Sequence, residues 1–166
     1  MDSAEFTNLV PWLVAERLDD ASAPVQVQPE FLHEKFPSWG FRTGPIITVV
    51  AMYPERNELR VTPGLAIDVP YTPAVSHYVN RLNNKELVFG RAFLVGNDES
   101  GLGAVLMQEI IFGHSLSWDY PPSVQYALQQ IATLSGQAAR LAPDVVTRCG
   151  GRHFNDGEGT FLQMNG

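Results

Sequence analysis

Signals for helices and strands follow one another along this chain in an order that points to one kind of fold. A helical pattern near the start is followed by three strand signals, a second helix, two further strands and a long helix that stops at Gly150-Gly151. Two of the strand pairs are typical of β-hairpins. The order α-β-β-β-α-β-β-α therefore predicts an α+β domain in which an antiparallel sheet packs against helices.

Length and composition favour a single domain. The chain has 166 residues, of which 45% are apolar and 17% charged, enough to bury a core of ordinary size. We find no internal repeat and no linker that would divide it. Residues 1–151 are predicted to form the domain, and the polar, glycine-rich residues 152–166 are predicted to be a flexible tail.

Charge excludes several classes of partner. The formal charge is −7 and only 11 residues are Lys or Arg, which argues against a nucleic-acid binder, because phosphate neutralisation needs clustered basic residues. Residues 1–5 are acidic where a signal peptide is basic, and no apolar run approaches the roughly 20 residues that span a bilayer. With the single Cys149, these features predict a cytoplasmic protein that binds neither nucleic acid nor membrane.

The first half of the chain contains a helix pattern and a hairpin. Apolar residues near helical spacing predict a helix up to about residue 20, and Pro11 favours a start late enough to leave the proline in the first turn. Pro29 weakens the alternation over 25–36, which predicts an edge or irregular strand. The β-branched run 46–53 and its partner 59–69 predict a hairpin.

The second half begins with a helix whose start is well marked. Thr72 as N-cap and Pro73 at the first helical position predict it, and Asn83-Asn84 is expected to end it. A second hairpin is predicted over 87–96 and 102–112. Ser123 is expected to cap a long helix that follows, and Pro143 is expected to bend or interrupt its last turns.

This order of elements resembles the YbjN family and the type III secretion chaperone-like proteins of bacteria. The resemblance covers residues 5–151 and also depends on three short strings, Val79-Asn80-Arg81-Leu82-Asn83, Phe89-Gly90-Arg91-Ala92-Phe93 and the final Gly150-Gly151. It implies an α+β sheet flanked by helices, frequent homodimers and a role in holding or sensing another protein. The family as a whole has no agreed biochemical activity.

No pattern in the chain predicts catalysis. The four histidines lie far apart, and neither a nucleophile elbow nor a phosphate-binding loop occurs. Cys149 and His153 are compatible with a nucleophile and base or half a metal site, but a buried cysteine beside a helix end explains them better. The acidic pairs in turns are interpreted as solvated charges, and Asp68 as a turn cap. We therefore expect no enzyme activity, no metal and no cofactor.

A binding function is predicted from the apolar strands, which are apolar on both faces. Either the helices of the domain cover both faces, or a second subunit or a protein ligand covers part of one. We place the partner-binding surface on Tyr78, Phe89, Arg91 and Phe93, because an arginine between two phenylalanines suits the margin of an interface. Arg91 reaching solvent or pairing with a carboxylate of its own domain is the alternative.

The sequence thus predicts a non-enzymatic, homodimeric interaction module, chaperone-like or an adaptor, that binds an apolar segment of a partner protein. The alternative is a small-molecule sensor or an enzyme whose site is assembled between sheet and helices. An extended apolar groove favours the first, and a closed cavity with converging polar groups favours the second.

Overall fold

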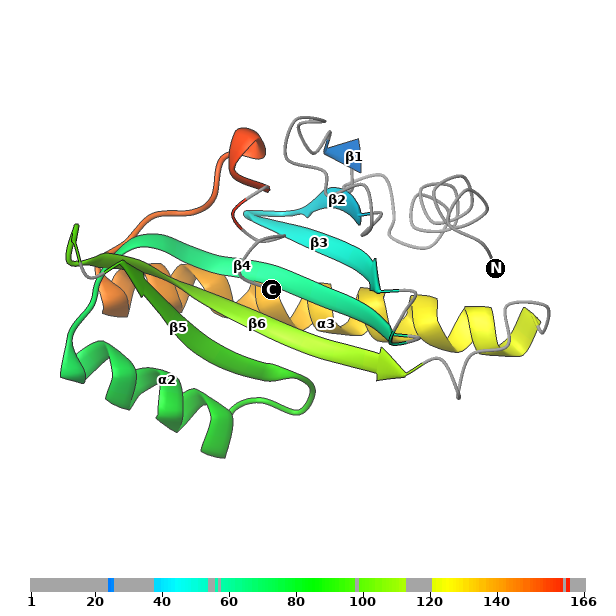
Figure 1. Cartoon of the computed structure of the whole chain (residues 1–166). Coiled ribbons are helices and arrows are strands. Elements are labelled where there is room, and N and C mark those ends of the chain that lie inside the picture. The colour runs from blue at the N-terminus through cyan, green and yellow to red at the C-terminus, as the bar shows by residue number, and fades with distance from the viewer. Residues whose placement is uncertain are drawn as a thin grey trace.

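The computed structural model describes residues 24–25, 38–53, 56, 58–97, 99–112, 121–159 and 161. They form an antiparallel six-stranded sheet in the order β1-β2-β3-β4-β6-β5, with two long helices (Figure 1). The elements are β1 (Pro24–Val25), β2 (Ser38–Thr43), β3 (Ile46–Tyr53), β4 (Glu58–Pro70), α2 (Pro73–Lys85), β5 (Arg91–Asn97), β6 (Leu102–Phe112), α3 (Pro121–Cys149) and the short η4 (Asp156–Glu158). The predicted α+β class is confirmed, whereas the predicted first helix lies outside the described residues.

The central hairpin forms as its β-branched sequence predicts. β3 pairs with β4 from Thr48 opposite Pro63 to Tyr53 opposite Glu58, so the second half of β4 extends beyond its neighbour. On its other side β4 pairs with β6 along its whole length, with register shifts at Gly64/Ala66 and Ile67/Val69. We call this extension, residues 64–70, the overhang of β4; on the side where β3 would continue, it has no partner in β3.

Helix α2 begins where the sequence predicts. The Thr72 hydroxyl accepts a hydrogen bond from the amide of Val75, and Pro73 occupies the first turn, where its missing N–H costs nothing. The helix extends to Lys85, just past the predicted end. Asn83 lies in its last turn, and its side chain has a role in the sheet that is described below.

One strand prediction is corrected and another lies mostly outside the described residues. Of the edge or irregular strand predicted over 25–36, only Val25 is described, in the two-residue edge strand β1. The neighbour of β3 is Ser38–Thr43, which was not predicted as a strand. β5 begins at Arg91 rather than at residue 87, because Gly90 adopts φ +67°, outside the extended region. A Cβ at Gly90 would lie 2.7 Å from the Leu134 side chain, so the bend also needs a glycine for space.

Helix α3 starts two residues before the predicted cap and continues through Pro143 to Cys149. The expected interruption at Pro143 does not occur. Pro143 is exposed, so its ring lies on a side of the helix that faces water. The helix ends where predicted, with Gly150 at φ +78°.

The two faces of the sheet are covered differently. The first face packs against α2 and α3 in a large core, and the Thr48 and Ser135 hydroxyls hydrogen-bond across it at 3.0 Å. Figure 1 shows α3 running along the sheet and α2 beside β5. The second face carries a smaller buried cluster, formed by Ile47, Val49, Ala104, Leu106 and Phe154.

Phe154 belongs to the segment predicted to be a flexible tail, and it is 2% exposed. Arg152 forms a bridge with Ile67 through two backbone hydrogen bonds of 2.9 Å. The prediction is therefore corrected for residues 152–159, which pack on the second face. The apolar Phe154 side chain supplies the reason, since its burial outweighs the polar composition around it.

Candidate partner-binding surface

The four residues predicted to bind a partner do not share one surface. Arg91 and Phe93 lie on the second face of β5, where Phe93 is opposite Leu106 and packs against the smaller cluster. Arg91 is exposed and forms no ion pair with any other described residue. These two residues keep the relation that strand alternation predicts.

Tyr78 points away from that face and toward α3. Its hydroxyl donates a hydrogen bond of 2.9 Å to Asp144, and the guanidinium groups of Arg81 and Arg148 lie 5.3 and 5.8 Å from its ring centre. Burial, followed by the Asp144 hydrogen bond, raises the pKa of Tyr78. Arg148 also lowers the pKa of Asp144. Tyr78 therefore joins α2 to α3 and does not converge with Phe93.

Phe89 lies in the bend before β5, outside the strand. The buried side chain of Gln137, on α3, holds this bend: its oxygen accepts from the Val88 amide at 3.1 Å and its nitrogen donates to the Phe89 carbonyl at 2.8 Å. With the backbone fixed in this way, both side chains project outward, and Val88 is 78% and Phe89 39% exposed.

Exposed apolar side chains gather at both ends of β5. Val88 and Phe89 lie at its start. At its far end are Leu102, the partner of Asn97 in the ladder, and Tyr71, whose ring lies against Gly96 so closely that a Cβ there would collide with it. We call the set of Tyr71, Val88, Phe89, Arg91 and Leu102 the β5 edge surface.

The backbone of β5 is open along part of this edge. The Asn83 amide occupies it at one point, donating to the Ala92 carbonyl and accepting from the Ala92 amide, both at 2.7 Å, as a paired strand would. Because antiparallel residues alternate in the direction of their hydrogen bonds, the N–H and C=O groups of Leu94 and Gly96 point the same way as those of Ala92. Among the described residues, no hydrogen bond to these outward groups is found.

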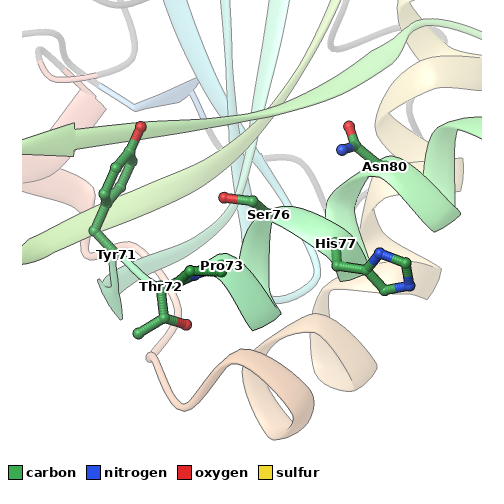
Figure 2. A pocket seen from close by; sticks show the side chains of 6 residues that line it. All are labelled: Tyr71, Thr72, Pro73, Ser76, His77 and Asn80. Carbon is green, nitrogen blue, oxygen red and sulfur yellow. The ribbon is translucent and has the colours of Figure 1, made fainter.

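A hollow of about 510 Å³ lies beside the first turns of α2, lined by Tyr71, Thr72, Pro73, Ser76, His77 and Asn80. Figure 2 shows the Ser76 side chain projecting toward Tyr71, whereas the His77 ring points away from Tyr71. The lining offers hydroxyls, one amide and one imidazole, with no carboxylate. It is an open surface depression, and its polar groups do not converge on one point as a catalytic constellation requires.

The residues that the sequence analysis considered as nucleophiles, bases or metal ligands lie in surroundings typical of structural residues. Cys149 is buried in the larger core, and burial raises the pKa of its thiol, which disfavours the reactive thiolate. Asp68 adopts φ 57°, an uncommon value for a residue with a side chain, and its carboxylate accepts a hydrogen bond of 2.7 Å from Arg152. Within the described part of the chain, no group of three His, Cys, Asp or Glu is placed to hold a metal ion.

Several residues of the β5 edge surface were missed from the sequence. Val88 was assigned to a regular strand, and Tyr71 and Leu102 were not considered as surface residues. One signal was present: the glycine that follows Val88-Phe89 permits a bend and would have placed both side chains outside the ladder. The clamps formed by Asn83 and Gln137 leave no such signal, because their targets depend on the tertiary fold.

Comparisons with known proteins give little beyond this geometry. No protein-family model matches the chain, and no curated protein matches it significantly. Among solved structures it is similar to a chain of the ExsC-ExsE complex, at 15% sequence identity and a TM-score of 0.41, over 86% of this chain and 97% of that chain. At these values the likeness adds nothing to what the strands and helices show by themselves. Among the described helices, none is both long and apolar enough to cross a membrane.

Proposed function

We propose that this chain is a non-enzymatic protein-interaction module, homodimeric and chaperone-like or an adaptor, that binds an apolar segment of a partner protein. The observation that carries the proposal is the β5 edge surface, where exposed apolar side chains flank an outer strand with open backbone groups. The sequence resemblance to the YbjN and type III secretion chaperone-like proteins supports the same proposal. The cytoplasmic location stays a prediction from the sequence.

An open strand edge flanked by apolar side chains invites pairing with another chain. Edge strands of monomeric proteins are usually shortened, charged or covered. Here α2 lies beside β5, but its Asn83 hydrogen-bonds only to the backbone of Ala92. Val88 and Phe89 supply the apolar contact, and Arg91 supplies a charged rim of the kind found around interface centres. A second copy pairing edge to edge gives the two-fold arrangement that most homodimers use.

The alternative function, a small-molecule sensor or enzyme, has weaker support. Its natural place is the hollow beside α2, which is open and has no carboxylate in its lining. Small-molecule sites usually enclose most of their ligand. The described surface therefore favours an extended polypeptide over a small molecule.

Charge reversal at the edge tests the proposal. Arg91→Glu and Phe89→Glu should each convert a dimer into the 18.3 kDa monomer in light scattering at micromolar concentration, because both place a carboxylate in the proposed interface. Arg140→Glu, on an exposed position of α3, is the matched charge reversal and should leave the dimer intact. An unmodified chain that is monomeric, or a dimer that both edge variants retain, would count against the proposal.

A further inference from the structure

The segment that follows α3 returns across the second face of the sheet and fastens there in three ways. Gly150 turns the chain, and Gly151 lies so close to β4 that a Cβ would be 2.7 Å from the Val69 side chain. Arg152 then bridges Ile67, Phe154 enters the smaller cluster, and Phe161 packs beside it with ring centres 6.0 Å apart. We call residues 152–159 with Phe161 the C-terminal clip.

The clip sits on β4 as an added strand would. β4 extends beyond β3, and on that free edge Arg152 exchanges both backbone hydrogen bonds with Ile67. One residue further along the chain, the bulge at Ile67/Val69 turns Asp68 outward into a left-handed conformation. The Asp68 carboxylate therefore lies on the part of the β4 edge that extends beyond β3, where a cationic side chain can contact it.

The polar contacts of the clip lie at the surface. The Arg152 guanidinium donates to Asp68 at 2.7 Å and to Glu158 at 3.0 and 2.7 Å, and all three side chains remain partly exposed. Arg42 donates to the Phe154 carbonyl at 3.2 Å. Exposed ion pairs stabilise a contact weakly, so the buried anchor is the Phe154 ring rather than the charges.

Beneath the clip lies a ready-made apolar floor. Ile47 and Val49 of β3 and Ala104 and Leu106 of β6 are buried there, although α2 and α3 pack on the other face. Phe93 and Val95 of β5 continue the floor toward the rim, where Arg91 is exposed. The described cover of this face is a short segment held by one backbone bridge, the Phe154 ring and exposed charges, and such a cover is suited to exchange.

We propose that the second face is a docking site for an extended partner segment carrying a cationic side chain two residues before an aromatic ring, and that the C-terminal clip occupies this site in cis. The backbone of the partner pairs with Ile67, its cation meets Asp68, and its ring replaces Phe154. The proposal rests on the proposed function only in that the ligand is a polypeptide, since Arg91 at the rim is the one residue of the β5 edge surface that borders this site.

Peptide binding to the full chain tests this docking site. The probe is a fluorescein-labelled peptide with the sequence of residues 150–166, titrated by fluorescence anisotropy. A tethered segment competes at an effective concentration of about millimolar, so the unmodified chain should bind the peptide weakly. The Phe154→Ala/Phe161→Ala chain, with its cover loosened, should bind it at least about ten-fold more tightly.

Two controls keep the outcome interpretable. A peptide carrying Arg152→Glu and Phe154→Ala should not bind, because it lacks both the cation and the ring. If the double variant fails to fold by circular dichroism, the Arg152→Ala chain decides instead, since it removes an exposed side chain and leaves Asp68 and the floor intact. It should show a smaller gain in peptide affinity, because the exposed charges hold the clip less firmly than the Phe154 ring does.

Three results would overturn the docking site. Folded variants that bind the peptide no better than the unmodified chain, or equal binding of the control peptide, show that the clip is only structural. Unfolding of both variants shows that it is an inseparable part of the core. A dimer that the clip substitutions dissociate assigns the face to a second copy of the chain. The Phe89→Glu result does not enter any of these, because Phe89 is not part of the second-face cluster, so failure of the β5 edge surface is recognised separately.

Discussion

The two faces of the sheet bury similar side chains under unlike covers. On the first face, α2 and α3 contribute apolar residues from successive helical turns, and polar contacts such as Thr48 with Ser135 are buried. On the second face, the described cover of a smaller cluster is the rings of Phe154 and Phe161 and a few exposed charges. Burial of a residue therefore does not measure how firmly it is held. Stability depends on whether the cover can leave without the rest of the fold.

If the two faces are held unequally, the largest difference is expected between two truncations of buried side chains, one on each face. Leu82→Ala, on the first face, should lower the free energy of unfolding by about 2–5 kcal/mol, as for other buried leucines. Phe154→Ala should cost less, about 1–3 kcal/mol, because its loss is limited by the free energy that holds the clip in place. Urea unfolding followed by circular dichroism measures both. An equal or larger cost for Phe154→Ala would remove the distinction between the faces.

A smaller effect is expected from the clamp that joins the β5 bend to α3. Gln137→Ala leaves the Val88 amide and the Phe89 carbonyl without their partner, which should cost about 1–3 kcal/mol. Gln129→Ala, on an exposed position of the same helix, should stay within about 0.5 kcal/mol. Chemical denaturation of the two variants is a direct comparison, and equal costs would show that the bend does not depend on Gln137.

The smallest predicted effect is a pH dependence confined to the second face. The Arg152 hydrogen bonds hold the pKa of Glu158 below its ordinary value of 4.5. A lowered folded-state pKa means that the contribution is present above the unfolded value and is lost as the pH falls through the folded one. The protection factors of the Ile67 and Arg152 amides in hydrogen exchange should therefore fall below about pH 4.5, by an amount equivalent to about 0–1 kcal/mol.

Glu158→Gln is the control for this pH effect. It should remove the dependence at the clip while amides of α3 on the first face keep theirs unchanged. If the clip amides of the glutamine variant still respond to acid as those of the unmodified chain do, Glu158 is not the group that titrates.

Local signals in the sequence predicted the elements whose determinants are local. The β-branched hairpin and the Thr72-Pro73 helix start were predicted from a few adjacent residues, and both are present. β2 was missed because only Trp39 and Phe41 alternate there with small or polar neighbours, and its pairing with β3 is what makes it a strand. The predicted interruption at Pro143 was wrong because a proline in the sequence does not show whether its side of the helix faces water.

Only the part of the candidate site that follows from strand alternation was predicted correctly. Arg91 and Phe93 share a face because β5 is extended between them. Tyr78 was misplaced, since the direction of a helical side chain depends on its tertiary partner, here Asp144, 66 positions away. The buried role of Phe154 was hidden for the same reason, because composition alone describes the segment around it as polar.

The overhang of β4 has a consequence for the order in which the molecule is made. Asp68 and Arg152 are 84 positions apart, and at about 5–20 residues per second a ribosome needs roughly 4–17 s to pass from one to the other. During that interval every nascent chain presents β4 before the residues that complete its edge exist. Folding of the second face is therefore last in time, and a ligand that reaches the chain during synthesis meets no internal competitor.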